Sequence, residues 1–318
     1  MRISLVIKLI VLAQLIIISV MGINIYHKKN TIVNKEVSVS PIDKFTVQQI
    51  ETNNLKYFYE IGVNQVATWS ATFLEKPVIM KYNEDGLNDV KNYMAKKESR
   101  TFRIITLGDS YTFGAYVNTK DNWTELLESK LNEKLKCRNI DKFEVINLGV
   151  GGYDLAYEVE RYKRIGMKYD PDLIIWTLVE LGRINELRSP VYEECINHRE
   201  NGATNEDCWN YAINKVVKKY GMNYIINKQR EAVNELRKVY DKPIFFVDYY
   251  GKHGKIVKNV SKSINFDKIL TKEYLLKNYS YKEIHFIDSH PNELGHKLIT
   301  DILFDQLLKT NQIQCEAL

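Results

Sequence analysis

The sequence predicts an α/β fold, in which helices cover both faces of a mainly parallel five-stranded sheet. Short apolar, β-branched runs recur from residue 103 onward, and segments with helical spacing of apolar residues separate most of them. Such alternation is typical of three-layer α/β/α proteins, because each crossover helix packs back on the sheet. An apolar stretch at the start of the chain predicts one transmembrane or signal helix ahead of this fold.

The elements follow from their local patterns. Strands are expected at residues 103–108, 143–148, 173–179, 244–249 and 283–287. The third of these runs is apolar throughout, so it is expected to be buried on both faces. Helices are expected at residues 122–135, 155–165, 209–240 and 293–308. Residues 251–280 are basic and polar and are expected to form a surface excursion with a short helix.

The composition bounds the class of protein. The 318 residues are 45% apolar and 27% charged, which excludes a disordered chain, a collagen-like fibre and a small disulfide scaffold. The formal net charge is only +5, so the sequence predicts no nucleic-acid partner, which would require a concentrated basic patch.

Residues 1–24 carry only two charges, Arg2 and Lys8, and are long enough to cross a bilayer core of about 30 Å. They are either an uncleaved signal anchor or a signal peptide with a weak cleavage site at Val20-Met21-Gly22. The anchor is favoured because no A-x-A site is present. Both alternatives predict an extracytoplasmic domain, tethered to the membrane or secreted.

The remaining chain divides by composition. Residues 25–50 are polar and predict a linker, and residues 51–100 predict an N-terminal extension packed on a main domain at residues 101–312. In an exported protein, Cys195 and Cys208 could close a short loop as a disulfide. The alternative is that they are two unrelated thiols. Their spacing matches no zinc-binding pattern.

Two loops at the carboxyl ends of the first two strands carry candidate functional groups, because ligands bind at this edge of open parallel sheets. Residues 108–114 (Gly-Asp-Ser-Tyr-Thr-Phe-Gly) place Ser110 directly after the first strand, between glycines that permit a tight turn. Residues 147–153 contain Gly149, Gly151 and Gly152, which allow a backbone N–H to approach a ligand closely. Taken singly, each loop is also compatible with an ordinary turn.

A third loop, at residues 288–296, begins Asp-Ser-His-Pro-Asn. Asp288 is placed to accept a hydrogen bond from Nδ1 of His290, which leaves Nε2 free to act as a base. A lone histidine is more often a surface or satisfied core residue. The neighbouring aspartate and the serine loop at the same sheet edge favour a catalytic role here.

In this order, the loops make the chain similar to the SGNH (GDSL-like) hydrolases over about residues 80–310. Residues 83–89 (Asn-Glu-Asp-Gly-Leu-Asn-Asp) also resemble the lead-in found in many anchored members. The resemblance implies that Ser110 is the nucleophile, His290 the base and Asp288 the acid of a catalytic triad. It also implies that the N–H groups of Ser110 and Gly152 form an oxyanion hole.

The segment after the third predicted strand departs from the family pattern. Where the family has Gly-x-Asn-Asp after the third strand, this sequence has Glu180-Leu181-Gly182, and the nearest asparagine is Asn185. Asn185 is therefore the candidate third oxyanion donor. The alternative is that Arg183 and Glu186 form an ion pair there without a catalytic part.

The resemblance implies acyl transfer through a serine, with no metal or organic cofactor. The leading hypothesis is an esterase acting on acyl esters, such as acetyl esters, of an extracytoplasmic glycan or lipid. The alternatives are an O-acyltransferase that uses the same triad on envelope polysaccharide, and a catalytically inactive glycan-binding protein. Residues 183–242 are expected to contribute to the substrate site, where Tyr192, Trp209 and Tyr211 either stack on sugar rings or pack the insertion.

Overall fold

The computed structural model describes residues 47–50, 52, 55, 58–178, 184, 214–215, 217–249, 268–270, 277–313 and 315–317. They all belong to one compact unit, Lys44–Leu318, and the preceding unit, Met1–Asp43, lies outside them. The predicted anchor or signal peptide and most of the predicted linker therefore lie outside the described residues. Among the helices of the described part, none is long and apolar enough to cross a membrane.

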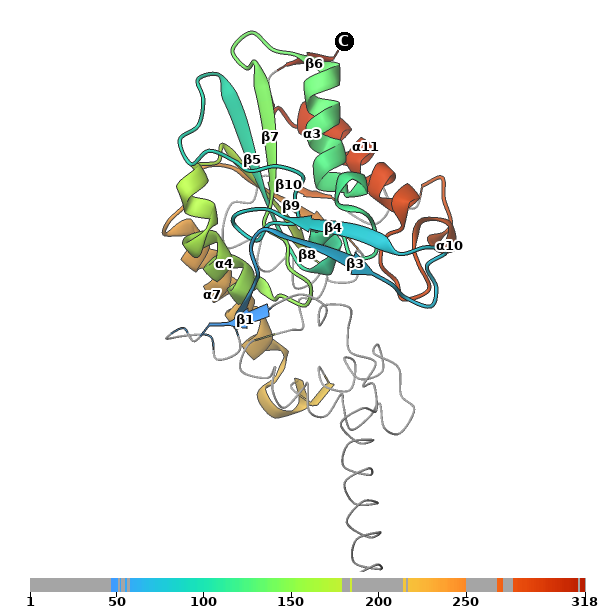
Figure 1. Ribbon diagram of the computed structural model, residues 1–318. Helices are drawn as coiled ribbons and strands as arrows, with labels where there is room; N and C mark the ends of the chain where they lie inside the picture. Colours follow the sequence, from blue (N-terminus) through green and yellow to red (C-terminus); the bar gives the residue numbers. More distant parts are fainter. Residues whose placement is uncertain are drawn as a thin grey trace, which may run out of the picture. The chain divides into compact units, whose positions relative to one another are not determined.

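A parallel sheet of five strands forms the centre of the unit, in the order β10-β9-β8-β5-β7 (Figure 1). The strands are β5 (Thr101–Leu107), β7 (Lys142–Asn147), β8 (Leu173–Leu178), β9 (Ile244–Asp248) and β10 (Lys268–Leu270). Ile105 lies opposite Ile146 of β7 and Ile174 of β8, so apolar residues cross the sheet in register. The predicted parallel sheet and four of its five strands are confirmed.

The predicted strand at residues 283–287 is wrong. Residues Tyr281–Ile284 form a short helix, α10, whose start is fixed by a capping box between Ser280 and Glu283. After this helix the chain makes only an isolated bridge between His285 and Pro291. The fifth strand of the sheet is instead β10, within the segment that the sequence predicts to be a surface excursion.

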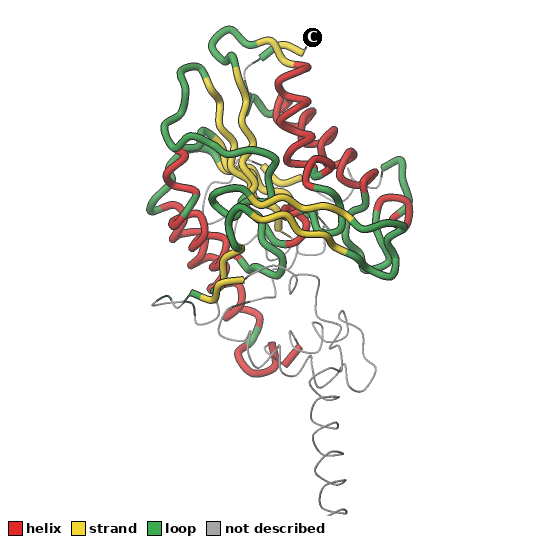
Figure 2. Tube along the Cα trace, in the orientation of Figure 1, coloured by secondary structure: helices red, strands yellow, loops and turns green. Residues whose placement is uncertain are grey.

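Helices cover both faces of the sheet, as predicted (Figure 2). The helices are α3 (Trp123–Lys134), α4 (Leu155–Arg164), α7 (Met222–Arg237) and α11 (Glu293–Lys309). Gly221, with φ +77°, separates α7 from the helical residues 217–220, so the predicted continuous helix at residues 209–240 is interrupted. Residues 209–213 lie outside the described residues.

Two apolar cores result from the alternation of side chains along the strands. Ile105 and Trp176 point to the core that contains residues of α4 and α7. Ile104 and Ile175 point to the core that contains residues of α3 and α11. All six residues of β8 are buried, so its apolar run packs against the cores on both faces of the sheet.

Antiparallel strands precede the sheet. β1 (Val47–Gln49) pairs with β2 (Tyr59–Ile61), and β3 (Gln65–Trp69) pairs with β4 (Val78–Tyr82). The β3–β4 hairpin contacts the turn after β5, because the Trp69 ring lies 5.9 Å from that of Phe113. β2 is held to α4 by a buried ion pair between Glu60 and Arg161.

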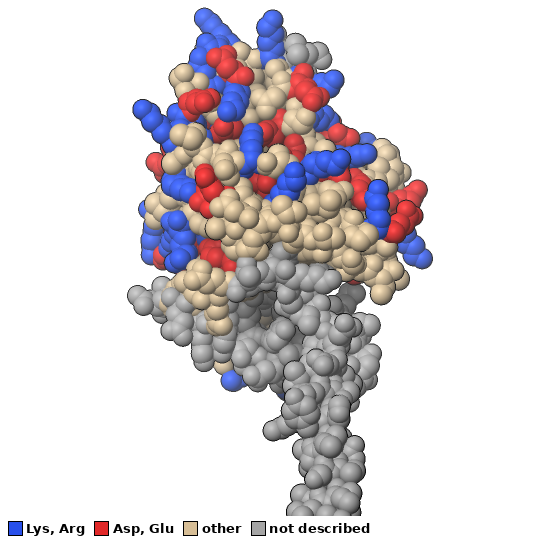
Figure 3. All heavy atoms as spheres, in the orientation of Figure 1, with Lys and Arg blue, Asp and Glu red and all other residues tan. Residues whose placement is uncertain are grey.

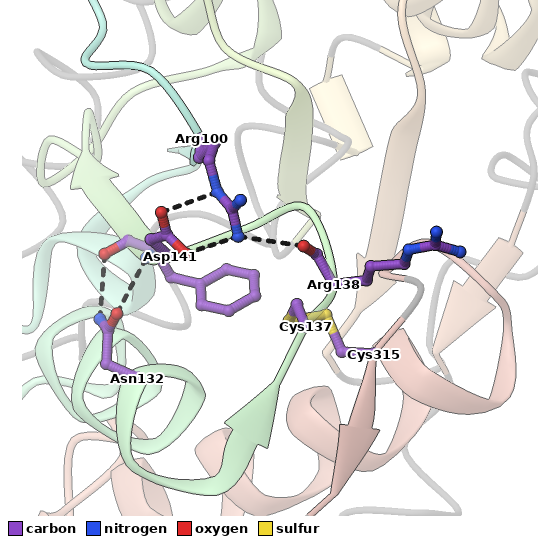
Figure 4. The surroundings of a disulfide bond; sticks show 7 residues. Arg100, Asn132, Cys137, Arg138, Asp141 and Cys315 are labelled. Atoms are coloured by element: carbon purple, nitrogen blue, oxygen red, sulfur yellow. Dashed lines mark hydrogen bonds and ion pairs between the residues drawn. A yellow bond between two sulfur atoms is a disulfide. The ribbon is translucent and has the colours of Figure 1, made fainter.

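A disulfide joins Cys137 and Cys315 beside a short antiparallel pair, β6 (Leu135–Lys136) with β11 (Glu316–Ala317) (Figure 4). It connects the end of α3 to the C-terminal segment across 178 residues of sequence. Arg100 lies nearby and binds Asp141 at 2.7 Å. Cys195 and Cys208, the candidate pair in the sequence, lie outside the described residues.

Acidic and basic side chains are intermixed on the described surface seen in Figure 3. One surface pair is formed by Lys130 and Asp301, at 2.5 Å. Inside the protein, Arg103 is fully buried and pairs with Glu144 at 2.7 Å. Removing Glu144 would leave the buried Arg103 guanidinium without this carboxylate, which is costly.

Candidate active site

Ser110 occupies the first position of a one-turn helix, α2 (Ser110–Phe113), directly after β5. Gly108 permits this sharp turn, because its φ is +154° and a Cβ there would lie 2.2 Å from Oγ1 of Thr112. Asp109 caps the helix, since its carboxylate accepts a hydrogen bond from the N–H of Tyr111 at 3.1 Å. The turn leaves the Ser110 side chain half-buried at the carboxyl end of a central strand.

The structure brings Ser110, Asp288 and His290 together although the serine lies far from the other two in the sequence. Nε2 of His290 lies 2.8 Å from Oγ of Ser110, and Nδ1 of His290 lies 3.0 Å from Oδ2 of Asp288. The His290 N–H also donates to Oδ1 of Asp288 at 3.2 Å. Ser289, with φ +79°, makes the tight turn that lets the two neighbours face each other.

Charge and hydrogen bonding keep the Asp288 carboxylate ionised, and the hydrogen bonds determine which nitrogen of a neutral His290 ring carries the proton. Burial disfavours the Asp288 carboxylate, but hydrogen bonds and charge from His290, together with a hydrogen bond from Tyr116, lower its pKa below the usual value. An ionised carboxylate only accepts hydrogen bonds, so Nδ1 of His290 carries the proton toward Asp288. In the neutral ring, Nε2 then has its lone pair toward the Ser110 hydroxyl, which is the arrangement of a general base.

The glycine loop after β7 packs directly on the Ser110 turn. The Val150 N–H donates to the Gly108 carbonyl at 3.2 Å, and a Cβ on Gly149 would lie 2.4 Å from the backbone nitrogen of Phe113. Gly152 has φ +76°, and a Cβ on it would lie 3.2 Å from the Tyr59 hydroxyl. Gly152 thus belongs to a loop fixed against the nucleophile turn. Asn185, the third candidate donor, lies outside the described residues, as do Glu180, Leu181, Gly182, Arg183 and Glu186.

Asn88, in the segment at residues 83–89, is hydrogen-bonded to the nucleophile turn and to its neighbours. The Asn88 amide donates to the carbonyl of Phe113, the last residue of α2, at 2.6 Å. Thr119 donates its hydroxyl to Oδ1 of Asn88 at 2.5 Å, and Asn147 donates to the Asn88 carbonyl at 3.2 Å. These buried bonds connect the lead-in segment, the turn after β5 and the end of β7.

Sequence reasoning missed three tyrosines around the triad. Tyr59 binds the glycine loop, because its hydroxyl donates to the Gly151 carbonyl and its own carbonyl accepts from Tyr153. Tyr111 and Tyr116 contact the Asp288–His290 turn. Tyr111 stands next to the nucleophile in the sequence, but no spacing marks Tyr59 or Tyr116.

Within the described part of the chain, no three His, Cys, Asp or Glu side chains are grouped so that they could hold a metal ion. Tyr192, Trp209 and Tyr211, the candidate aromatic contacts for a sugar, lie outside the described residues.

No protein-family model matches the sequence, and no curated protein matches it. Among solved structures, a two-domain esterase active on acetylated mannans shares 15% identity, and the match covers 68% of this chain and 51% of that one, with a TM-score of 0.46. The chain thus spans about half of that two-domain protein. The esterase EstA from Pseudoalteromonas sp. shares 14% identity over 66% of this chain and 99% of its own, with a TM-score of 0.43.

Axe2, an acetylxylan esterase from Geobacillus stearothermophilus, shares 15% identity over 67% of this chain and 97% of its own, with a TM-score of 0.43. Independently of these neighbours, the three predicted triad residues meet at the carboxyl edge of a parallel sheet. The chain resembles the SGNH (GDSL-like) hydrolases in the order of its motifs and in the place that its fold gives to Ser110, Asp288 and His290.

Proposed function

We propose that the chain is a serine-dependent esterase of the SGNH type. The observation that carries the proposal is the continuous hydrogen-bonded series from Ser110 through His290 to Asp288, with links of 2.8 and 3.0 Å. These lengths are the ones at which a nucleophile, its base and the group that orients the base act together.

In this mechanism, Nε2 of His290 accepts the Ser110 proton while Oγ attacks the ester carbonyl. The carbonyl oxygen becomes an oxyanion, which the N–H groups of Ser110 and Gly152 stabilise. The tetrahedral intermediate then collapses, and His290 gives its proton to the departing alcohol. Water, activated by the same histidine, hydrolyses the acyl-serine and restores the hydroxyl, while ionised Asp288 stabilises the imidazolium in both steps.

The proposed substrate is an ester with a short acyl group, such as acetyl, on a glycan or lipid outside the cytoplasm. The Cys137–Cys315 disulfide supports the location, because such bonds persist chiefly in oxidising compartments. The apolar segment at residues 1–24 supports it as well, as a signal anchor that attaches the domain to the membrane or as a cleaved signal peptide that releases it.

The test is hydrolysis of p-nitrophenyl acetate and butyrate by the full-length chain, compared with Ser110→Ala. We expect measurable turnover, with faster reaction of the acetate, and a fall in kcat of about 10⁴-fold or more in the variant. Thr72→Ala is the matched control, because Thr72 is an exposed hydroxyl residue outside the triad. Ester hydrolysis that persists in Ser110→Ala would refute the assignment of Ser110 as the nucleophile.

A folded wild-type chain that turns over esters only when a glycan hydroxyl is supplied would replace the hydrolase by an O-acyltransferase. A folded chain that forms no acyl-serine under either condition would leave the inactive glycan-binding protein as the better interpretation. Mass spectrometry of the acylated Ser110 peptide separates these outcomes.

A further inference from the structure

All four carbonyl groups of α2, the helix that carries the nucleophile, accept hydrogen bonds. A helix of one turn is too short to satisfy its own last carbonyls, so these need partners from elsewhere. The Ser110 carbonyl accepts the two backbone N–H groups that follow the helix. The carbonyls of the next three residues accept from the side chains of Asn88, Asn122 and Trp123, which are all buried.

Asn122 holds the last two carbonyls of the helix with its amide nitrogen. Nδ2 lies 3.1 Å from the carbonyl oxygen of Thr112 and 3.1 Å from that of Phe113. Gly114, with φ +83°, permits this close approach, because a Cβ there would lie 2.6 Å from Nδ2 of Asn122. Asn88 donates to the same Phe113 carbonyl from a different segment of the chain. The end of the nucleophile helix is therefore held from two sides.

Trp123 connects the nucleophile helix to the helix that follows the base. Its indole Nε1–H donates to the Tyr111 carbonyl at 3.1 Å. Its backbone N–H donates to Nδ1 of His296 at 3.1 Å, and its carbonyl accepts from the Thr300 hydroxyl at 3.3 Å. Both partners lie on α11, which begins shortly after His290. One buried residue is thus bonded to the nucleophile helix and to the element next to the base.

These bonds bear on the distance between the nucleophile and its base. Ser110 is the first residue of α2, so a displacement of this helix moves Oγ relative to Nε2 of His290. A buried carbonyl that loses its donor is costly, and the helix can recover the loss only by moving toward another donor. The side-chain donors therefore restrain the place of Ser110 as well as the fold.

We propose that Trp123, together with Asn122 and Asn88, is a positioning residue for Ser110. The three side chains act through the carbonyls of α2 and hold Oγ at hydrogen-bonding distance from His290. The inference rests on the proposed function. Its physical basis is that a small displacement of a catalytic group lowers the rate steeply.

The first test is Trp123→Phe in the full-length chain, because this change keeps an aromatic ring and removes the indole N–H. Tyr240→Phe is the matched control, since it also removes a buried donor to a backbone carbonyl, that of Pro243 at 3.1 Å, outside the site. With p-nitrophenyl acetate, at a temperature where both variants are fully folded, we expect kcat to fall roughly tenfold in Trp123→Phe. KM should change little, and Tyr240→Phe should keep the wild-type kcat.

A second variant separates the lost hydrogen bond from the smaller ring. Asn122→Ala removes two donors from the same helix and leaves the indole in place. We expect the same pattern, a lower kcat with little change in KM. A kcat equal to that of Tyr240→Phe in both folded variants would overturn the proposal while leaving the esterase intact.

The reaction of Ser110 with a p-nitrophenyl phosphonate gives a readout that a merely structural role would not move. Oγ bonds to phosphorus as p-nitrophenolate leaves, so the rate reports the placement of the nucleophile without hydrolysis of an acyl-serine. We expect the second-order rate constant to fall roughly tenfold in Trp123→Phe and to stay unchanged in Tyr240→Phe. A merely structural role would lower the free energy of unfolding and leave this rate constant unchanged, which would overturn the proposal.

Hydrogen exchange gives a readout that does not depend on any reaction. The Gly114 N–H donates to the Ser110 carbonyl, so its exchange reports local opening of α2. By mass spectrometry of the peptide that spans residues 108–115, we expect faster exchange in Trp123→Phe and wild-type exchange in Tyr240→Phe. Unchanged exchange in Trp123→Phe would overturn the positioning role. A wild-type chain without turnover or phosphonylation, together with faster exchange in Trp123→Phe, would refute the proposed function and retain the contact between Trp123 and α2.

Discussion

The hydroxyl of Tyr59 donates a hydrogen bond to the carbonyl oxygen of Gly151. A strand that precedes the sheet by about 40 residues of sequence thereby holds the glycine loop beside the nucleophile turn. The same loop contains Gly152, a proposed oxyanion donor. The strand β2, which carries Tyr59, therefore helps to hold the site in place. This relationship gives the first prediction.

Tyr59→Phe is expected to lower kcat several-fold, because the loop that carries the Gly152 N–H loses one of its attachments. The free energy of unfolding should fall by about 1 kcal/mol, the usual net contribution of one hydrogen bond. Steady-state kinetics and urea unfolding measure the two effects. A variant with lower stability but unchanged kcat would show that the loop keeps its position without Tyr59.

Two alanine substitutions in this loop should differ in severity. In Gly149→Ala the new Cβ would lie 2.4 Å from the Phe113 backbone nitrogen, which has no space to retreat, so folding itself should fail or lose several kcal/mol. In Gly152→Ala the nearest atom is the tip of the Tyr59 side chain at 3.2 Å, and the main cost is the positive φ, about 1–2 kcal/mol.

Circular dichroism and thermal unfolding distinguish the two variants. Gly152→Ala should remain folded while its kcat falls, because a displaced N–H weakens the oxyanion contact. Equal stability of the two variants would contradict the close packing of Gly149 on the nucleophile turn.

The sequence was sufficient for the central strands for a physical reason, and the three residues that it predicts as a triad meet in the structure. Central parallel strands are buried on both faces, so each appears as a continuous apolar run such as β8. Ser110 directly follows β5, whereas Asp288 and His290 follow the short helix α10, so for these two the prediction comes from their short motif and not from a strand end. The sequence alone therefore places Ser110 at the carboxyl end of a central strand, and the folded chain shows that Asp288 and His290 meet it there.

Other features depend on contacts that the sequence does not display. In the β3–β4 hairpin, Val66 and Ile79 are exposed, which hides the alternation of buried and exposed positions. β10 has three residues in a polar region at the edge of the sheet and lacks a strand pattern. Residues 283–287 look like a strand, but the capping box from Ser280 to Glu283 starts a helix. The Tyr116 ring meets the His290 ring only in the folded chain.

The Cys137–Cys315 disulfide should contribute substantially to stability, because it closes a very long loop. Replacing both cysteines by alanine is expected to lower the free energy of unfolding by about 2–5 kcal/mol. In urea unfolding, a reductant should shift the wild-type midpoint to lower urea and move the double variant much less. A wild-type midpoint that ignores the reductant would contradict a stabilising role.

Activity should respond less than stability to the loss of this disulfide. The bond lies beside β6 and β11, and it joins the end of α3 to the C-terminal segment. At a temperature where the double variant is fully folded, its kcat for p-nitrophenyl acetate should therefore equal that of the wild type.

His296 should make the stability depend on pH. It is fully buried on α11, and its Nδ1 accepts a hydrogen bond from the backbone N–H of Trp123 at 3.1 Å. Burial, with smaller effects of His290 and His285, lowers the pKa of His296 to about 3. Below an unfolded pKa of about 6.5, the unfolded state binds a proton that the native state does not, so stability falls as pH decreases from about 6.5 toward 3.

Between pH 7 and pH 5 this residue should lower the free energy of unfolding by about 1–2 kcal/mol, because each unit of pKa difference corresponds to about 1.4 kcal/mol. Urea unfolding at the two pH values measures the effect. His296→Asn is the matched variant, since Oδ1 of asparagine can still accept the Trp123 N–H but the amide does not titrate. The variant should lose less stability on acidification than the wild type. An equal loss in both would assign the acid sensitivity to other groups, among which the Asp288 carboxylate, with its lowered pKa, loses its contribution only at lower pH.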